Sequence, residues 1–213
     1  VEHLRARGLR LIIYLDDIIL MAQNPVLLQN HLSWTIALLQ DLGFLINAHK
    51  SVLTPSQTIE FLGFQIDSVQ TQLLLPGHKV KDIKREWRKA ITKEYLPIRT
   101  LARLVGLLAF SIQAIFPGPL HYRALQRLKI SHIQKGASYA KLVPVSEEVR
   151  QELRWWIDHM EAWNGRAIFG SLPDTIIESD ASKAGWGLAA AIFRRGASGR
   201  RRNLPCISTA WSY

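Results

Sequence analysis

The chain has 213 residues, of which 48% are hydrophobic and 21% are charged, and these fractions exclude a disordered protein, a collagen-like repeat and a coiled coil. It carries 27 Lys and Arg against 17 Asp and Glu, and the resulting net charge of +10 favours a polyanion such as nucleic acid as partner. With Cys206 as the single cysteine, a disulfide scaffold and a cysteine-based zinc site within the chain are excluded, and no apolar run reaches the length of a membrane helix.

The first predicted element is a β-hairpin. Aliphatic runs at residues 9–15 and 18–22 are separated only by Asp16 and Asp17, and two apolar runs joined by two turn-forming residues are typical of a hairpin. Both strands are apolar on both faces at their inner ends. We therefore expect this hairpin to be deeply buried.

A helix is predicted next over residues 25–42, because its leucines and isoleucines recur at helical spacing, and Gly43 ends it. A short strand is expected at residues 44–47 and a further strand at residues 59–67. Gly63 lies in the middle of that second strand, where a glycine usually marks a bulge or a close backbone approach.

A basic helical region follows. Between His78 and Arg103 there are nine Lys or Arg against three Asp or Glu, and apolar residues spaced by three and four predict an amphipathic helix with a basic outer face. A second helix is expected over about residues 97–115 and is ended by the Pro-Gly-Pro at 117–119. Residues 131–144 look like a linker.

The C-terminal third begins with a predicted helix whose N-cap is Ser146 and which ends at Asn164-Gly165. After Pro173 the pattern changes to strands, expected at residues 175–179, 185–193 and 204–210. An arginine-rich loop at residues 194–202 precedes the last of them.

Asp16 and Asp17 form the first candidate site. Adjacent carboxylates at the tip of an apolar hairpin repel each other and cost desolvation energy, and a divalent cation relieves both problems. Magnesium prefers one or two carboxylates together with substrate phosphates. The alternative is that the pair serves only the turn, where Asp is common.

The order of motifs resembles the reverse transcriptases. Tyr14-Leu15-Asp16-Asp17 resembles their Tyr-x-Asp-Asp box on its hairpin, and residues 43–51 are similar to the next palm motif, which carries a lysine. Phe61-Leu62-Gly63-Phe64 looks like the primer-grip hairpin. The basic helices then occupy the position of the thumb, so the resemblance covers about the first 130 residues.

This resemblance implies roles for individual residues. Asp16 and Asp17 would bind catalytic Mg²⁺ or Mn²⁺, and Tyr14 would lie under the primer-terminal or incoming nucleotide. Lys50 would give a proton or charge to the leaving pyrophosphate, although a solvated loop lysine is an equal alternative. Phe61, Leu62, Gly63 and Phe64 would hold the primer strand, with core packing as the simpler explanation for the first two.

The basic helix would contact duplex phosphates, which positions a substrate without reading its sequence. The residues proposed for this are Lys81, Lys84, Arg85 and Arg88. A solvated helix face is the alternative.

A second site is suggested by residues 178–182, Glu-Ser-Asp-Ala-Ser, followed by Gly185-Trp186-Gly187. This pattern resembles the opening of the ribonuclease H fold, whose first strand delivers a metal-binding aspartate, and it would make Asp180 a catalytic and metal-binding residue. The alternative is an aspartate that merely ends a strand. With Trp155-Trp156 and the Pro-Gly-Pro, the arrangement looks most like DIRS-like retrotransposons, whose elements encode a tyrosine recombinase, and pararetroviral polymerases are the near alternative.

We therefore expect a mixed α+β fold, with a partial palm at 1–75, a thumb-like region at 76–130, a connection at 131–173 with a helix at 146–163, and a truncated ribonuclease H-like α/β domain at 174–213. The expected function is that of a retrotransposon RNA-directed DNA polymerase fragment. It is expected to be inactive alone, because the family's fingers and a further palm aspartate would precede Val1.

Expected partners are an RNA template, a DNA primer, their hybrid duplex, deoxynucleoside triphosphates and the rest of a polyprotein. No membrane partner is expected, and the expected location is intracellular, in the cytoplasm or nucleus. The alternatives are a non-catalytic nucleic-acid-binding remnant and, more weakly, a basic structural protein.

Overall fold

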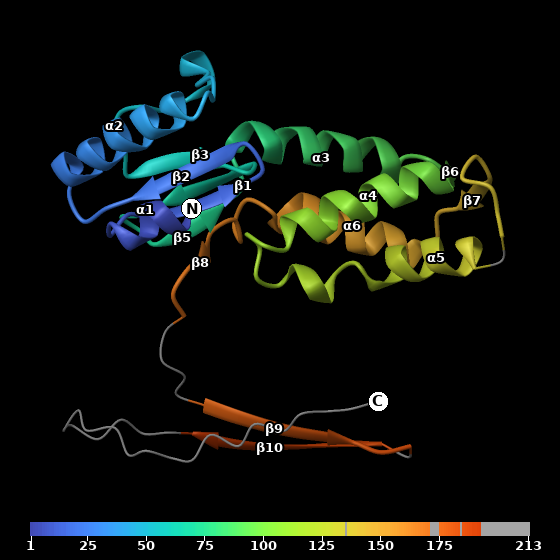
Figure 1. Cartoon of the computed structure of the whole chain (residues 1–213). Helices are drawn as coiled ribbons and strands as arrows, with labels where there is room; N and C mark the ends of the chain where they lie inside the picture. The colour runs from blue at the N-terminus through green and yellow to red at the C-terminus, as the bar shows by residue number, and fades with distance from the viewer. Residues whose placement is uncertain (135, 171–174, 184, 193–213) are drawn as a thin grey trace. The chain divides into compact units, whose positions relative to one another are not determined.

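The computed structural model describes residues 1–134, 136–170, 175–183 and 185–192 and forms two compact units, Val1–Phe169 and Gly170–Tyr213 (Figure 1). The predicted mixed α+β class is confirmed. The elements of the first unit are α1 (Glu2–Ala6), β1 (Arg10–Tyr14), β2 (Asp17–Met21), α2 (Pro25–Asp41), the 3-10 helix η1 (Ala48–Lys50), β3 (Thr58–Phe61), β4 (Phe64–Asp67), β5 (Gln72–Leu74), α3 (Gly77–Ile91), β6 (Tyr95–Pro97), α4 (Ile98–Ser111), the 3-10 helix η2 (Gly118–Leu120), α5 (Arg123–Ile133), β7 (Leu142–Pro144), α6 (Glu147–His159) and β8 (Arg166–Ala167).

β1 and β2 form the predicted antiparallel hairpin, with its loop one residue earlier than expected. The register pairs Tyr14 with Asp17, so the loop residues are Leu15 and Asp16, and Asp17 belongs to the strand. Leu15 has a φ of 55° and so supplies the positive φ that a two-residue hairpin loop requires.

The predicted deep burial of this hairpin is wrong. One face packs on a small core whose buried members are Leu4, Leu9 and Leu11. On the other face Ile12 is 50% exposed and Tyr14 57% exposed. Ile19, which pairs with Ile12 and shares its face, is only 7% exposed, so this second face is covered in part and is open around Ile12 and Tyr14. Among the described residues no third strand pairs with β1 or β2.

The helix after the hairpin is confirmed as α2. Asn24 caps it, because its Oδ1 accepts a hydrogen bond from the Leu27 amide over 2.8 Å, and Gly43 follows its end with a φ of 85°. The strand predicted at residues 44–47 is not formed, and Phe44 and Leu45 are exposed. A short apolar run without a neighbouring strand cannot satisfy its backbone as a sheet.

β3, β4, β5 and β8 form one antiparallel sheet in that order. The single strand predicted over 59–67 is two strands, because Leu62 and Gly63 have φ values of 50° and 77° and reverse the chain between them. β8 joins from far along the sequence. It is held there by Asn164, whose side-chain amide accepts from the Leu75 amide at 2.8 Å and donates to the Leu75 carbonyl at 2.9 Å.

Helices α3 to α6 pack together around the larger core (Figure 1). Trp87 of α3 and Trp156 of α6 are fully buried and meet edge to face with ring centroids 5.4 Å apart. The three predicted helices are confirmed. Helix α5 and the paired strands β6 and β7 were not predicted, and part of what looked like a linker at 131–144 belongs to them.

The second unit contains a hairpin of β9 (Thr175–Ala181) and β10 (Trp186–Ile192), which pairs Asp180 with Gly187. Both strands were predicted. The third predicted strand at 204–210 and the arginine-rich loop at 194–202 lie outside the described residues. Among the described helices, none has both the length and the apolar character that crossing a bilayer requires.

Candidate functional site

The tip of the β1–β2 hairpin presents two neighbouring carboxylates. Asp16 is the second loop residue and Asp17 is the first residue of β2, and both are exposed. Within the described part of the chain, neither side chain takes part in a hydrogen bond or an ion pair. Both carboxylates are therefore open to an external cation.

Tyr14 lies beside this pair. In an antiparallel ladder, residues directly opposite each other share a face. The Tyr14 ring and the Asp17 carboxylate therefore project from the same side of the hairpin. This is the open side of the hairpin, on which Tyr14 is 57% exposed. The arrangement sets an aromatic ring next to a carboxylate, with solvent access to both.

Lys50 is placed at the end of η1, and its side chain is exposed. Its backbone amide donates to Asn47 Oδ1 over 3.2 Å. Among the described residues, no hydrogen bond or ion pair links Lys50 to Asp16 or Asp17. The structure therefore does not bring this lysine into contact with the aspartates.

The β3–β4 turn contains Phe61, Leu62, Gly63 and Phe64, the residues expected to hold the primer strand. Phe61 is half-buried, and Leu62 at the tip is 40% exposed. The Phe64 ring stacks on Phe110 of α4, with centroids 4.3 Å apart and planes 20° apart. The turn thus rests on the helices from one side and presents Leu62 on the other.

The basic face of α3 is smaller than the sequence suggests. Lys81, Arg85 and Arg88 are exposed, although Arg85 pairs with Asp82 at 2.8 Å. Lys84 is 9% exposed, and its Nζ donates to Glu161 Oε1 over 2.8 Å. Lys84 therefore faces the helical core instead of the solvent, in contrast to its expected phosphate contact.

Two further cations extend this face. Arg99 and Arg103 of α4 are exposed, and Arg103 pairs with Glu86 of α3. Both were counted in the basic run without being given a role. Their spacing of four residues, in the first and second turns of the second predicted helix, is the signal that could have identified them.

Asp180 lies on β9 in the second unit and is exposed. Glu178 is two residues earlier on the same strand, so the two carboxylates project from one face of the hairpin. Across all described residues, no group of three or more His, Cys, Asp or Glu is arranged to hold a metal ion.

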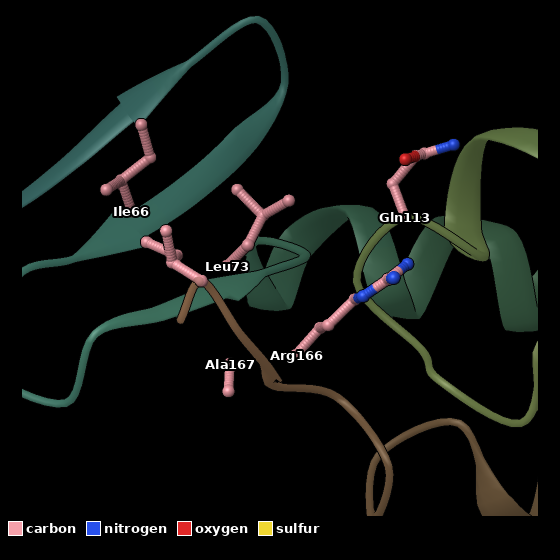
Figure 2. Close-up of a pocket in the computed structure, with 6 residues that line it drawn as sticks. Ile66, Leu73, Gln113, Arg166 and Ala167 are labelled. Carbon is pink, nitrogen blue, oxygen red and sulfur yellow. The ribbon is translucent and has the colours of Figure 1, made fainter. Parts of the chain in front are cut away.

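A pocket of about 390 Å³ lies elsewhere in the first unit (Figure 2). It is lined by Ile66, Leu73, Gln113, Arg166, Ala167 and Ile168. These residues come from the inner strands β4 and β5, from the edge strand β8 with the residue after it, and from the segment after α4, and none of them belongs to the aspartate hairpin or the β3–β4 turn.

Comparison with known proteins relates these features to one family. Residues 1–66 match the sequence model of the family described as Reverse transcriptase (RNA-dependent DNA polymerase). This segment contains the aspartate hairpin, Lys50 and the β3–β4 turn. A comparison with curated proteins finds no match.

Two solved structures share the fold. The foamy viral protease-reverse transcriptase dRH in complex with ds DNA aligns with a TM-score of 0.57 and 17% identity, over 86% of this chain and 32% of that one. The foamy viral protease-reverse transcriptase in complex with RNA/DNA hybrid aligns with a TM-score of 0.59 and 17% identity, over 90% of this chain and 26% of that one. The chain thus has the fold of part of a reverse transcriptase and spans between a quarter and a third of their length.

Proposed function

We propose that this chain is the palm and thumb portion of an RNA-directed DNA polymerase and binds a primer–template duplex. The observation that carries this proposal is the exposed, unpaired Asp16 and Asp17 at the tip of a tight hairpin, inside the segment that matches the reverse transcriptase family. The fold shared with the two foamy viral structures supports the same assignment.

The residues present fit a divalent cation by their chemistry. Two adjacent carboxylates offer oxygen ligands, which Mg²⁺ and Mn²⁺ prefer, and Mg²⁺ commonly uses one or two carboxylates with the rest of its ligands from phosphate and water. Their exposure leaves room for a triphosphate beside them. When bound, such cations would activate a primer 3′-hydroxyl and neutralise the departing pyrophosphate.

The chain's own residues then have distinct tasks. Asp16 and Asp17 hold the cations, and the Tyr14 ring, on the same face as Asp17, supports the base or sugar of the nucleotide next to them. Lys50 donates a proton or charge to the pyrophosphate in this scheme. It needs a nucleotide to bridge it to the aspartates, because the described structure contains no contact between them.

Duplex binding falls to the second hairpin and the basic helix. Phe61, Leu62, Gly63 and Phe64 support the primer strand at the β3–β4 turn. Phosphate contacts come from Lys81, Arg85 and Arg88, and we leave out Lys84 because it is buried against Glu161. Such contacts make the affinity strongly dependent on salt.

The second unit is assigned more broadly. We propose that β9 and β10 open a ribonuclease H-like domain in which Asp180 is a metal ligand, and that the parent element is DIRS-like, with an RNA template, a DNA primer, deoxynucleoside triphosphates and the rest of a polyprotein as partners. An intracellular location, cytoplasmic or nuclear, follows from this assignment. The resemblance implies one metal-binding palm aspartate in addition to Asp16 and Asp17. We assign no residue of this chain to that role, so we expect the chain alone to incorporate no nucleotides.

Cation binding tests the proposal directly. Mn²⁺ is titrated into the 213-residue chain with a primer–template hybrid and a deoxynucleoside triphosphate, and bound Mn²⁺ is followed by its paramagnetic signal. Asp16→Asn and Asp17→Asn should each weaken binding by about tenfold or more, because each removes a charged ligand. Asp41→Asn, an exposed aspartate at the end of α2, is the matched control and should change nothing.

The outcome distinguishes the proposal from its main alternative. Salt-sensitive hybrid binding that is indifferent to Mn²⁺ and to both substitutions would identify a non-catalytic nucleic-acid-binding remnant. Nucleotide incorporation by the isolated chain in a primer-extension assay would show that the expected inactivity is wrong.

A further inference from the structure

The β3–β4 turn is held from beneath by a lysine of the neighbouring helix. Lys79, in the first turn of α3, donates a hydrogen bond from Nζ to the carbonyl oxygen of Gly63 over 3.2 Å. The side chain is half-buried, so this contact is partly shielded from water. Lys79, one of the nine basic residues between His78 and Arg103, is therefore directed at the backbone of the turn.

Any side chain at position 63 would displace the Lys79 ammonium group from this place. A Cβ added to Gly63 would collide with Lys79 Nζ and would lie 3.3 Å from Phe110 Cζ. Gly63 also has a φ of 77°, which disfavours any other residue. The positive φ of the chain reversal therefore requires the glycine, and its missing side chain leaves the space in which the ammonium group lies.

An aromatic pair completes the arrangement. Lys79 Nζ lies 4.3 Å from the centroid of the Phe110 ring, and Phe110 in turn stacks on Phe64. The ammonium group therefore has a carbonyl oxygen and the face of an aromatic ring as partners. Three elements, α3, α4 and the β3–β4 hairpin, meet at this one charge.

We propose that Lys79 is a positioning residue that fixes the β3–β4 turn on the helices, and that it makes no phosphate contact. The inference rests on the proposed function in one respect, namely that the turn supports the primer strand. With the Gly63 carbonyl bound by Lys79, the turn keeps one backbone conformation and presents Leu62, which is 40% exposed, to the solvent.

Hydrogen–deuterium exchange of the free chain tests the contact itself. In Lys79→Met, which keeps the apolar stem and removes the charged donor, amides of residues 58–67 should exchange about tenfold faster or more, since a hydrogen bond to a charged group is lost. Lys89→Met, an exposed lysine of the same helix, is the control and should leave these amides unchanged. Unchanged exchange in Lys79→Met, with its folding verified by circular dichroism, would overturn the proposal.

The salt dependence of hybrid binding tests the role. Loss of one phosphate contact lowers the slope of log K against log salt by about 0.9, so Arg88→Met should lower it by this amount. Lys79→Met should instead weaken binding about tenfold with an unchanged slope, because it removes a hydrogen bond to the turn and no phosphate contact. A lowered slope in Lys79→Met would make it a phosphate contact and contradict the proposal.

The two readouts separate failure of this inference from failure of the proposed function. If the wild-type chain binds no hybrid, the polymerase assignment fails, and the exchange experiment still decides whether Lys79 holds the turn. If the hybrid binds with the expected slope and exchange at the turn does not change, only the inference about Lys79 fails.

Discussion

Lys84 Nζ donates a hydrogen bond to Glu161 Oε1 over 2.8 Å and so joins the middle of α3 to the segment just after α6. The two ends of this contact differ in exposure, since the Lys84 side chain is 11% exposed and that of Glu161 is 67% exposed. The hydrogen bond and charge of Lys84 hold the pKa of Glu161 below its usual range. Because the Lys84 ammonium is buried and the Glu161 carboxylate is exposed, the ammonium loses more stabilisation than the carboxylate when its partner is removed.

This asymmetry predicts unequal effects of substitution. Glu161→Gln leaves a desolvated ammonium without a countercharge, whereas Lys84→Met replaces the charge by an apolar group that suits its surroundings. Glu161→Gln should lower the melting temperature by about 2–4 °C and Lys84→Met by less. Glu148→Gln, which removes an exposed pairing with Arg127, is the control. A larger loss in Lys84→Met would contradict this view of the pair.

Two glycines of the helical region should respond in opposite directions to alanine. A Cβ at Gly118 would meet Trp156 Cη2 at 2.5 Å and Ile112 Cγ2 at 2.7 Å, so Gly118→Ala should destabilise the chain by about 1–3 kcal/mol through overpacking. Gly106 lies in α4 with nothing near the added atom, so Gly106→Ala should stabilise it by about 0.5–1 kcal/mol. Urea unfolding measures both, and a shift of the same sign in the two variants would refute the packing argument.

Asn164 should contribute more to stability than its half-buried position suggests. Both hydrogen bonds of its side chain go to the backbone of Leu75, which is 2% exposed. Asn164→Ala leaves that amide and carbonyl without partners and should cost about 1–3 kcal/mol for each buried group left unpaired. Asn164→Asp keeps the acceptor, but its second carboxylate oxygen faces the Leu75 carbonyl oxygen and repels it, so this variant should also destabilise the chain in urea unfolding. A loss below about 1 kcal/mol in Asn164→Ala would contradict the role of the two hydrogen bonds.

His121 should make stability depend on pH. Its ring stacks on Trp155 with centroids 3.7 Å apart. Burial lowers the pKa of His121, Glu152 opposes this, and His159 adds to it. The unfolded chain therefore takes up a proton near the ordinary pKa of about 6.5, while the folded chain resists it. The contribution of this residue is fully present above that pH and is lost as the pH falls below it.

The variant His121→Phe tests this point, since it keeps a ring on Trp155 and removes the titrating group. The decrease in the urea midpoint between pH 7.5 and 5.5 should be smaller in His121→Phe than in the wild type. An equal decrease in both would assign the pH dependence to other groups.

Short-range patterns in the sequence predicted much of the fold. Helical spacing and caps identified α2, α3, α4 and α6, because these signals lie within a few residues of one another. The same holds for the aspartate hairpin, whereas residues 59–67 were predicted as one strand and form two. Helix α5 and the pairing of β6 with β7 were missed, since β6 pairs with a strand more than forty residues away and neither is an alternating run.

At the candidate site, two features depend on the tertiary structure. The two-residue turn pattern assigned Asp17 to the loop. The register of the hairpin instead places Asp17 in β2, opposite Tyr14. The exposure of Ile12 and Tyr14 also depends on what packs on β1 and β2, because an apolar strand sequence does not say how many layers cover it.

The sequence by itself determined the order of motifs, the acidic pair and the excess of positive charge, because these are properties of residue identity and local spacing. Only the tertiary structure decided which cations face solvent. Three lysines within two turns of α3 have different surroundings. Lys79 donates to the Gly63 carbonyl, Lys84 pairs with Glu161 just after α6, and Lys81 is exposed. Their surroundings come from segments distant in sequence, and those segments set the desolvation and the partners of each charge.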